Sequence, residues 1–371
     1  MKRYGTCFLV IILAISFLGT GCGKQAANQT PVDESGSPVL ADLAGQFQIN
    51  KAYFDMAMDR VPIIFRGQFQ DAAGKREYLE RLVVEAIFYL EGKRRKYYRK
   101  KEYQHTLDLR LYAGVLDELR KDMESKIAVT EEEVRAEYDN TIKKDREKRT
   151  YENYREAIER GLVQKRLKEQ YENKKEELLK EWKVVFHEDL LERMDPATTP
   201  QDQLPKLEDV LAEGENYRYT VGQLLKRIDQ APEDAKEKLR QNKEPKKLLD
   251  FVVREDVLFT FAVRQGLDKT ASYAMRKQIM EVATLSLITR REVISSDIVA
   301  TEEEGKKVYE ENPALFTRGK SVVPWEEAKE RAMTEATARK QLEAMRTLAK
   351  SLMRHRYPTT YYEANIEKHL N

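Results

Sequence analysis

Apolar residues recur at helical spacing along most of this chain, and the pattern of one half returns in the other. Leu79, Leu82, Val83 and Ile87 have the i, i+3, i+4, i+8 spacing of one helix face. The same spacing returns at Leu249, Val252, Val253 and Val257. Two further long helices are predicted at about 105–125 and 272–295, and two more highly charged ones at about 154–182 and 325–356. The pattern therefore predicts a mainly α fold.

Helix starts and short strands are predicted at matching places in both halves. Residues 39–49 and 210–219 are expected to be extended, and each segment leads to a residue that can cap a helix, Asn50 or Thr220. Two Thr-Glu-Glu-Glu sequences, which start at Thr130 and Thr301, have the spacing of a capping box. Brief apolar stretches at 184–186 and 361–362 close the two halves and could return as strands.

The common order of these features indicates a tandem duplication. Val39 and Val210 lie 171 residues apart, and the breakers Pro62 and Pro232 keep nearly the same offset. Charged amphipathic helices resemble one another, so a single match would mean little, whereas a series of ordered matches is specific. We expect two tandem helical modules with a few short strands, 39–195 and 210–371, joined by a linker at 196–209. Each module is long enough to hold its own core.

The first residues have the parts of an export signal. Two basic residues precede an uncharged apolar run from Cys7 to Leu18, which is short for a membrane-spanning helix. Small residues then lead directly to Cys22, as in a lipobox. We expect residues 1–21 to be removed and Cys22 to carry a lipid that anchors the protein to a membrane. The alternative is an ordinary signal peptide with an incidental cysteine.

Composition favours a soluble body outside the cytoplasm. Loss of the signal removes two of the 66 Lys and Arg residues and leaves as many bases as the 64 Asp and Glu residues, so bulk charge does not favour nucleic acid. Cys7 and Cys22 are the only cysteines, which excludes disulfides and thiol catalysis from the body. Residues 22–38 should form the lipidated cysteine and a flexible tether. Gly23 after the cysteine favours the periplasmic face of an outer membrane, where the cell has one.

The short strand before a capped helix, the Leu79-x-x-Leu82-Val83 helix and the Thr-Glu-Glu-Glu helix starts together resemble the SurA-type and PrsA-type extracytoplasmic foldases. In that family a helical chaperone domain flanks a parvulin prolyl-isomerase domain. The segment from Tyr309 to Phe316 resembles the one that leads into the isomerase domain. The resemblance implies two SurA-N-like chaperone modules that bind unfolded or partly folded exported polypeptides and need no cofactor.

The chain departs from this family where the isomerase domain would have to lie. Only fifteen residues separate Tyr138 from Tyr154, and fifteen separate Tyr309 from Trp325. A loop of this length can carry at most a hairpin. The paired histidines of a parvulin site are also missing, because His105, His187, His355 and His369 are scattered over predicted helices and tails. The sequence therefore offers no catalytic or metal-binding residues.

Seven basic residues fall within nine positions near the end of a predicted helix: Lys93, Arg94, Arg95, Lys96, Arg99, Lys100 and Lys101. The corresponding segment of the second half, 263–271, has only Arg264 and Lys269. Such a run is most often a solvated helix end. It is also suited to attract anionic lipid headgroups or acidic client segments.

Apolar side chains gather around the Pro62 break, at Met56, Met58, Ile63, Ile64, Phe65 and Phe69. Met and aromatic side chains adapt to varied partners, so these residues are candidates for client binding. Filling the core is the more ordinary role for them. The corresponding stretch of the second half, 227–239, is much more polar.

These features favour a lipid-anchored chaperone or holdase of the cell envelope without catalysis. The alternatives are a divergent peptidyl-prolyl isomerase and a dedicated structural subunit of an envelope complex. An isomerisation assay separates the first alternative from a holdase, and crosslinking separates the second, because a subunit has one stoichiometric partner where a holdase has many.

Overall fold

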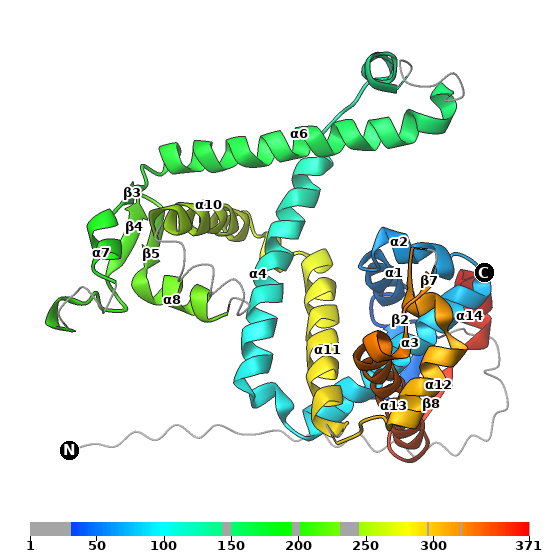
Figure 1. Cartoon of the computed structure of the whole chain (residues 1–371). Coiled ribbons are helices and arrows are strands. Elements are labelled where there is room, and N and C mark those ends of the chain that lie inside the picture. The colour runs from blue at the N-terminus through cyan, green and yellow to red at the C-terminus, as the bar shows by residue number, and fades with distance from the viewer. Residues whose placement is uncertain are drawn as a thin grey trace, which may run out of the picture.

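The computed structural model describes residues 31–142, 150–194, 201–230, 245–294, 297–319 and 321–370, and this part of the chain is mainly helical, as predicted. The helices form an open arrangement of two bodies and an arm (Figure 1). The first body is built around residues 39–94 and 325–370, the second body around residues 210–229 and 245–264, and the arm is the long helix at residues 151–181. None of the described helices is long and apolar enough to span a membrane. The expected signal peptide at 1–21 and the expected lipid site at Cys22 lie outside the described residues.

The first half begins with a β-hairpin and continues with helices. The side chain of Asn50 caps the first helix by accepting a hydrogen bond from the Tyr53 backbone N–H at 2.7 Å, as predicted. The elements are β1 (Val39–Leu43), β2 (Phe47–Asn50), α1 (Lys51–Asp59), α2 (Ile63–Arg66), η1 (Gly67–Phe69), α3 (Ala72–Arg94), η2 (Tyr97–Arg99), α4 (Lys101–Glu124), α5 (Glu131–Glu137), η3 (Tyr138–Ile142), α6 (Tyr151–Glu181), β3 (Val185–Phe186) and α7 (Glu188–Glu192).

The second half has a similar order, with an added short hairpin and with residues 231–244 outside the described part. Its elements are η4 (Gln201–Gln203), β4 (Val210–Gly214), β5 (Tyr217–Thr220), α8 (Val221–Asp229), α10 (Pro245–Arg264), η5 (Leu267–Lys269), α11 (Ala271–Val293), α12 (Glu302–Glu311), η6 (Pro313–Phe316), β6 (Thr317–Arg318), β7 (Ser321–Val322), α13 (Trp325–His355), β8 (Thr359–Tyr361) and α14 (Glu363–Leu370). Both predicted capping boxes, at Thr130 and Thr301, are formed. An origin by duplication agrees with this order and stays a prediction.

Each three-stranded sheet combines strands of both halves. In the first sheet β1 lies between β2 and β8, and Leu43 is opposite Thr359. In the second sheet β4 lies between β3 and β5, and Ala212 is opposite Phe186. The opening hairpin of each half is therefore completed by the closing strand of the other half.

The two main cores are shared between the halves in the same way. The first core combines residues of β1, α1 and α3 with Ile279 of α11 and Leu352 of α13. The second combines residues of β4, α8 and α10 with Leu119 of α4 and Leu178 of α6. The two expected modules, 39–195 and 210–371, therefore share their cores, although each is long enough to hold one of its own. The physical reason is length: α6 and α13 have 31 residues each, which carries the chain roughly 45 Å away from its own hairpin.

Two adjacent residues near the end of α3 fasten the halves together. A Cβ atom on Gly92 would lie 2.1 Å from the Thr289 hydroxyl oxygen, so only glycine allows α3 to approach α11 this closely. The carboxylate of Glu91 is 1% exposed and accepts hydrogen bonds from the guanidinium groups of Arg94 and Arg95 of the first half, both at 2.6 Å. It also accepts one from Arg356 of the second half at 3.0 Å.

The last part of the expected tether belongs to the folded body. The carboxylate of Asp33 accepts hydrogen bonds from the Ser35 and Ser37 backbone N–H groups at 2.9 and 2.8 Å, which closes a turn. The carbonyl of Pro31 accepts a hydrogen bond from the Asn365 side chain of α14 at 3.0 Å. The flexible tether was predicted to extend to residue 38, which is too far. Composition alone does not reveal the turn that the Asp33 side chain forms.

The segments that would have to carry a catalytic insert are short where they are described. After Tyr309 the chain forms η6, the two-residue strands β6 and β7 and then α13. The prediction of at most a hairpin is confirmed there. After Tyr138 the chain forms η3 up to Ile142, and residues 143–149 lie outside the described part.

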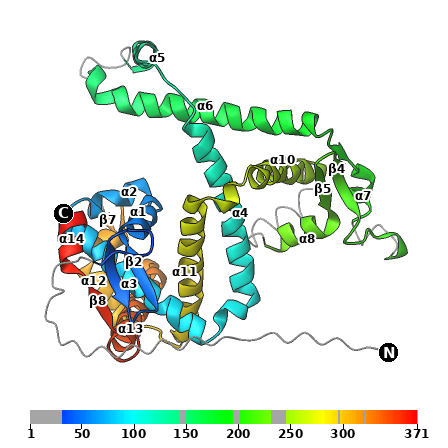
Figure 2. The same cartoon turned by 180° about the vertical axis from the view of Figure 1, so that it is seen from behind.

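Figure 2 shows the arrangement from behind: α6 with α5 crosses one end of the molecule, α4 and α11 run away from it, and α13 and β8 reach the opposite end. The loop that contains α2 lies on the side of the first body that is nearer to α6 (Figures 1 and 2).

Candidate functional site

The sequence around Pro62 forms a stiff projection from the first body. Pro62 has extended backbone angles, φ −54° and ψ 139°, which separate α1 from the four-residue helix α2. The guanidinium group of Arg66 then turns back and donates hydrogen bonds to the carbonyl of Val61 at 2.7 Å and to that of Asp59. Carbonyl groups left free at the end of α1 thereby gain partners.

The far end of the projection is fastened to α3. The Asp71 carboxylate accepts a hydrogen bond from the Gly74 backbone N–H at 2.7 Å and caps α3. A Cβ atom on Gly74 would lie 2.2 Å from the carbonyl oxygen of Gln68, so the loop rests directly on the helix. Phe69 is 4% exposed and packs on the ring of Tyr78 at 5.1 Å between ring centroids.

The structure divides the six apolar residues predicted for client binding into two groups. Ile63, Ile64 and Phe65 are 81%, 82% and 53% exposed, and they follow one another in α2. Phe69 belongs to the buried interior, and Met56 and Met58 pack against the first core. Of the six, only Ile63, Ile64 and Phe65 are exposed, whereas Met56 and Met58 are half-buried and Phe69 is buried.

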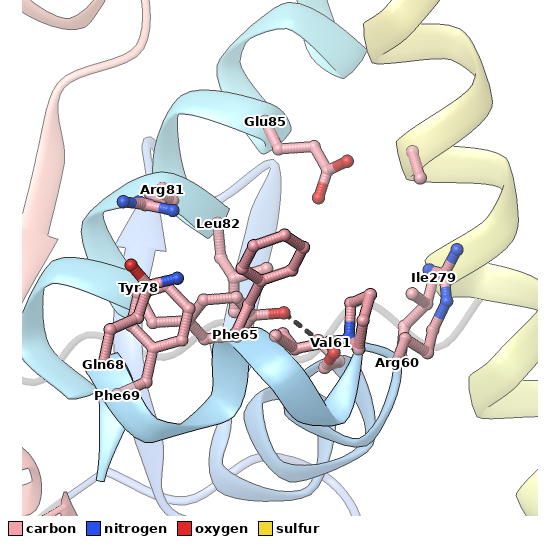
Figure 3. Close-up of a pocket in the computed structure, with 13 residues that line it drawn as sticks. Arg60, Val61, Phe65, Gln68, Phe69, Tyr78, Arg81, Leu82, Glu85 and Ile279 are labelled. Carbon is pink, nitrogen blue, oxygen red and sulfur yellow. Dashed lines mark hydrogen bonds between the residues drawn. The ribbon is translucent and has the colours of Figure 1, made fainter. Parts of the chain in front are cut away.

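A pocket of about 480 Å³ lies beside these side chains, between the α1–α3 region and α11 (Figure 3). Its apolar wall includes Val61, Phe65, Leu82 and Ile279. The ring of Phe65 points into the space between α2 and α3 in this view, with Leu82 beside it and Ile279 across from it on α11. This volume is within the range of sites that hold small ligands or peptide side chains.

The charged side chains that line the pocket are Arg60, Arg81 and Glu85. The carboxylate of Glu85 points into the opening from α3 (Figure 3) and has no ion pair or hydrogen bond among the described residues. Burial raises its pKa, although the positive charges of Arg290, Arg60 and Arg110 act in the opposite direction. Arg110 and Arg290 do not line the pocket, and burial lowers their pKa values as well. The pocket thus has an apolar floor and one partly desolvated carboxylate, that of Glu85, at its edge.

The pocket has the chemistry of a binding site. The Tyr78 hydroxyl, another polar group of the lining, donates to the Ala57 carbonyl at 2.8 Å, and burial raises the pKa of Tyr78 to about 12. Among the described residues no group of three or more His, Cys, Asp or Glu side chains could hold a metal ion. His105 and His187 lie at the surface, 3.7 Å from the carboxylate of Asp229 and 3.2 Å from that of Glu213, respectively.

The predicted basic run lies elsewhere, at the ends of α3 and η2 and the start of α4, and part of it is neutralised. Arg94 and Arg95 bind Glu91, and the ammonium group of Lys100 is 2.6 Å from the Glu292 carboxylate. Lys93, Lys96, Arg99 and Lys101 have no carboxylate partner among the described residues. Only these four keep the uncompensated charge that the sequence suggests for all seven.

Sequence reasoning found the apolar side of the site and missed its polar side. Glu85 lies on α3 among charged residues of ordinary helical spacing, and nothing in its sequence position points to the pocket. Ile279 is one of many apolar residues in α11. The available signal was the Pro62 break, which localises the projection without identifying what faces it.

Comparison of the chain with protein-family models, with curated proteins and with solved structures found no match.

Proposed function

We propose that this protein is a non-catalytic chaperone or holdase that captures apolar segments of unfolded or partly folded polypeptides at α2 and the adjoining pocket. One observation carries the proposal: three consecutive large apolar side chains, Ile63, Ile64 and Phe65, are held in solvent by a loop that is fastened at both ends. Contiguous exposed apolar residues of this kind mark interaction sites.

The pocket adds a place for a side chain of the bound segment. A segment lying along α2 can cover the two isoleucines and insert an apolar side chain next to Phe65 and Leu82. The Arg60 guanidinium group is exposed and has no partner among the described residues, so its N–H groups are free to donate to backbone carbonyls of a client. Backbone contacts of this kind do not depend on sequence, which suits varied clients.

The strength expected from this site is modest. Burial of three large apolar side chains contributes about 6 kcal/mol before the costs of ordering the client are subtracted. Single sites should therefore bind with dissociation constants near or above the micromolar range. Weak capture with fast release is appropriate for a holdase that must return its client unaltered.

Envelope location and lipid anchoring at Cys22 are part of the proposal and derive from the signal and lipobox in the sequence. The alternatives of an isomerase and of a dedicated complex subunit have no observation in the described structure that favours them over a holdase.

The test compares two triple variants in aggregation assays with an exported protein diluted from urea. Changing Ile63, Ile64 and Phe65 to Gln should abolish most of the protection of the client. The matched control changes three helical apolar residues that are also exposed but scattered over the surface, Leu225, Phe251 and Leu342, to Gln. The proposal is wrong if the two variants protect the client equally while both keep the far-UV circular dichroism of the parent.

A further inference from the structure

Tertiary structure enlarges the basic run into a surface that the sequence does not show. The last turn of α13 carries Arg354, and Arg356 follows it, in a different half of the chain from Lys93 and Arg94. A hollow of about 670 Å³ lies between them and is lined by Gln46, Leu90, Lys93, Arg94, Arg356 and Tyr357. We call the cations Lys93, Arg94, Lys96, Arg99, Lys101, Arg354 and Arg356 the basic end.

Acidic residues at this end do not cancel its charge. Glu91 is buried beneath the arginines, Glu102 is paired with Arg291 at 2.6 Å, and Glu292 is paired with Lys100. Lys93, Lys96, Arg99 and Lys101 face solvent without a carboxylate partner in the described structure. The net positive charge is therefore accessible to an external anionic surface.

The backbone at Lys96 is unusual for a charged residue. Lys96 has φ 61° and ψ 27°, in the left-handed region, where the absence of a Cβ atom favours glycine. The corresponding position of the second half, 170 residues later, is Gly266 with φ 74°. Lysine therefore occupies a left-handed position that the second half fills with glycine. Compared with glycine, Lys96 adds a positive charge at this position.

We propose that the basic end lies against anionic phospholipid headgroups of the membrane that holds the predicted lipid on Cys22. Tyrosines accompany the cations: Lys100 lies over the ring of Tyr97 at 5.3 Å, and Arg99 lies 5.8 Å from the ring of Tyr98, which is 37% exposed. Amphipathic rings beside cations are favourable at the boundary between headgroups and acyl chains.

Chain geometry allows the lipid and the basic end to meet one membrane. Pro31, the first described residue, is only nine positions after Cys22, and nine residues reach at most about 30 Å. Pro31 lies beside the start of β1, because its carbonyl accepts a hydrogen bond from the Val39 backbone N–H. The strand β1 then spans about 16 Å before the turn that contains Gln46, which lines the 670 Å³ hollow of the basic end. The ends of α3 and α13 lie at the opposite end of the molecule from α6 (Figure 1), so a membrane bound at the basic end leaves the arm and α2 directed away from it.

Vesicle binding tests this surface without the lipid and without a client. The protein is the chain from residue 22 with Cys22→Ser, and the vesicles contain phosphatidylcholine with or without about 30% phosphatidylglycerol. The parent should bind only the anionic vesicles and should be released by salt. Changing Lys93, Lys96, Arg99 and Lys101 to Glu should lower the partition coefficient by at least ~100-fold.

The matched control reverses four exposed cations on α6: Arg160, Lys165, Lys168 and Lys180. This variant has the same net charge, and its partition coefficient should fall by less than about five-fold. Gln at the four basic-end positions should give an intermediate loss and guards against misfolding of the Glu variant. Equal losses in both charge-reversed variants, or no binding of the parent, would overturn the proposal. Binding of polyglutamate without binding of anionic vesicles would assign the surface to an acidic polypeptide instead.

Discussion

Replacing Glu91 with Gln should destabilise the fold in a way that depends on pH. Burial by itself would raise the pKa of Glu91, but hydrogen bonds from Arg94, Arg95 and Arg356 outweigh burial and hold the pKa at about 2. Because the folded state binds the proton less tightly than the unfolded state, the charged carboxylate favours folding. The change from the ordinary value of 4.5 to about 2 corresponds to about 3 kcal/mol at neutral pH.

The pH window follows from the same two values. The contribution of Glu91 is complete above its unfolded pKa of 4.5 and is lost as the pH falls toward about 2. The Glu91→Gln variant lacks this contribution at every pH. The difference in unfolding free energy between the parent and the variant should therefore be largest at neutral pH and should shrink steadily in acid.

Urea unfolding, followed by circular dichroism at a series of pH values, measures this difference. Glu77→Gln is the control, because Glu77 is 58% exposed and its contact with Arg81 at 2.6 Å lies at the surface. That change should alter stability by less than about 0.5 kcal/mol. A loss for Glu91→Gln that stays the same from neutral pH to about pH 3 would refute the electrostatic explanation.

Two further predictions concern the shared fold. Asp42 and Thr360 are opposite each other in β1 and β8. Cysteines at these two positions should therefore form an intramolecular disulfide in the Cys22→Ser background. If mass spectrometry finds only intermolecular disulfides, the pairing of β1 with β8 is wrong. Burial raises the pKa of Asp256 despite the hydrogen bond that the carboxylate accepts from Tyr217. The folded state therefore loses stability when Asp256 becomes charged, as the pH rises through the raised pKa. Asp256→Asn should therefore be more stable than the parent at neutral pH, with the gain disappearing in acid, and a constant difference would show that charge is not the cause.

Local structure was predictable wherever the signal lay within one element. Asn50, Thr130 and Thr301 cap helices because a side-chain oxygen and a free backbone N–H lie within three residues of each other. Apolar periodicity likewise identified the buried face of α3, from Leu79 to Ile87. These interactions are decided by neighbours in the chain and are visible without the fold.

Pairing between distant segments was not predictable. Residues 185–186 form a strand of only two residues, which has no periodicity to identify a partner. Phe65 and Phe69 look equivalent in sequence, yet the first is exposed and the second buried, because Tyr78 lies over only one of them. Glu91 neutralises part of the basic run, and it also binds Arg356, which lies 265 residues later in the chain. Such effects depend on which helices come together.

The pairing of β1 with β8 has a consequence for the order of events during folding. In the chain, β1 comes more than 300 residues before its partner at Thr359–Tyr361. Closing so long a loop from an unstructured chain costs about 5 kcal/mol in entropy. The second sheet, whose strands are close in sequence, can form while the first hairpin still lacks β8. Until β8 joins the first sheet, the edge of β1 that it covers is open to pairing with other chains.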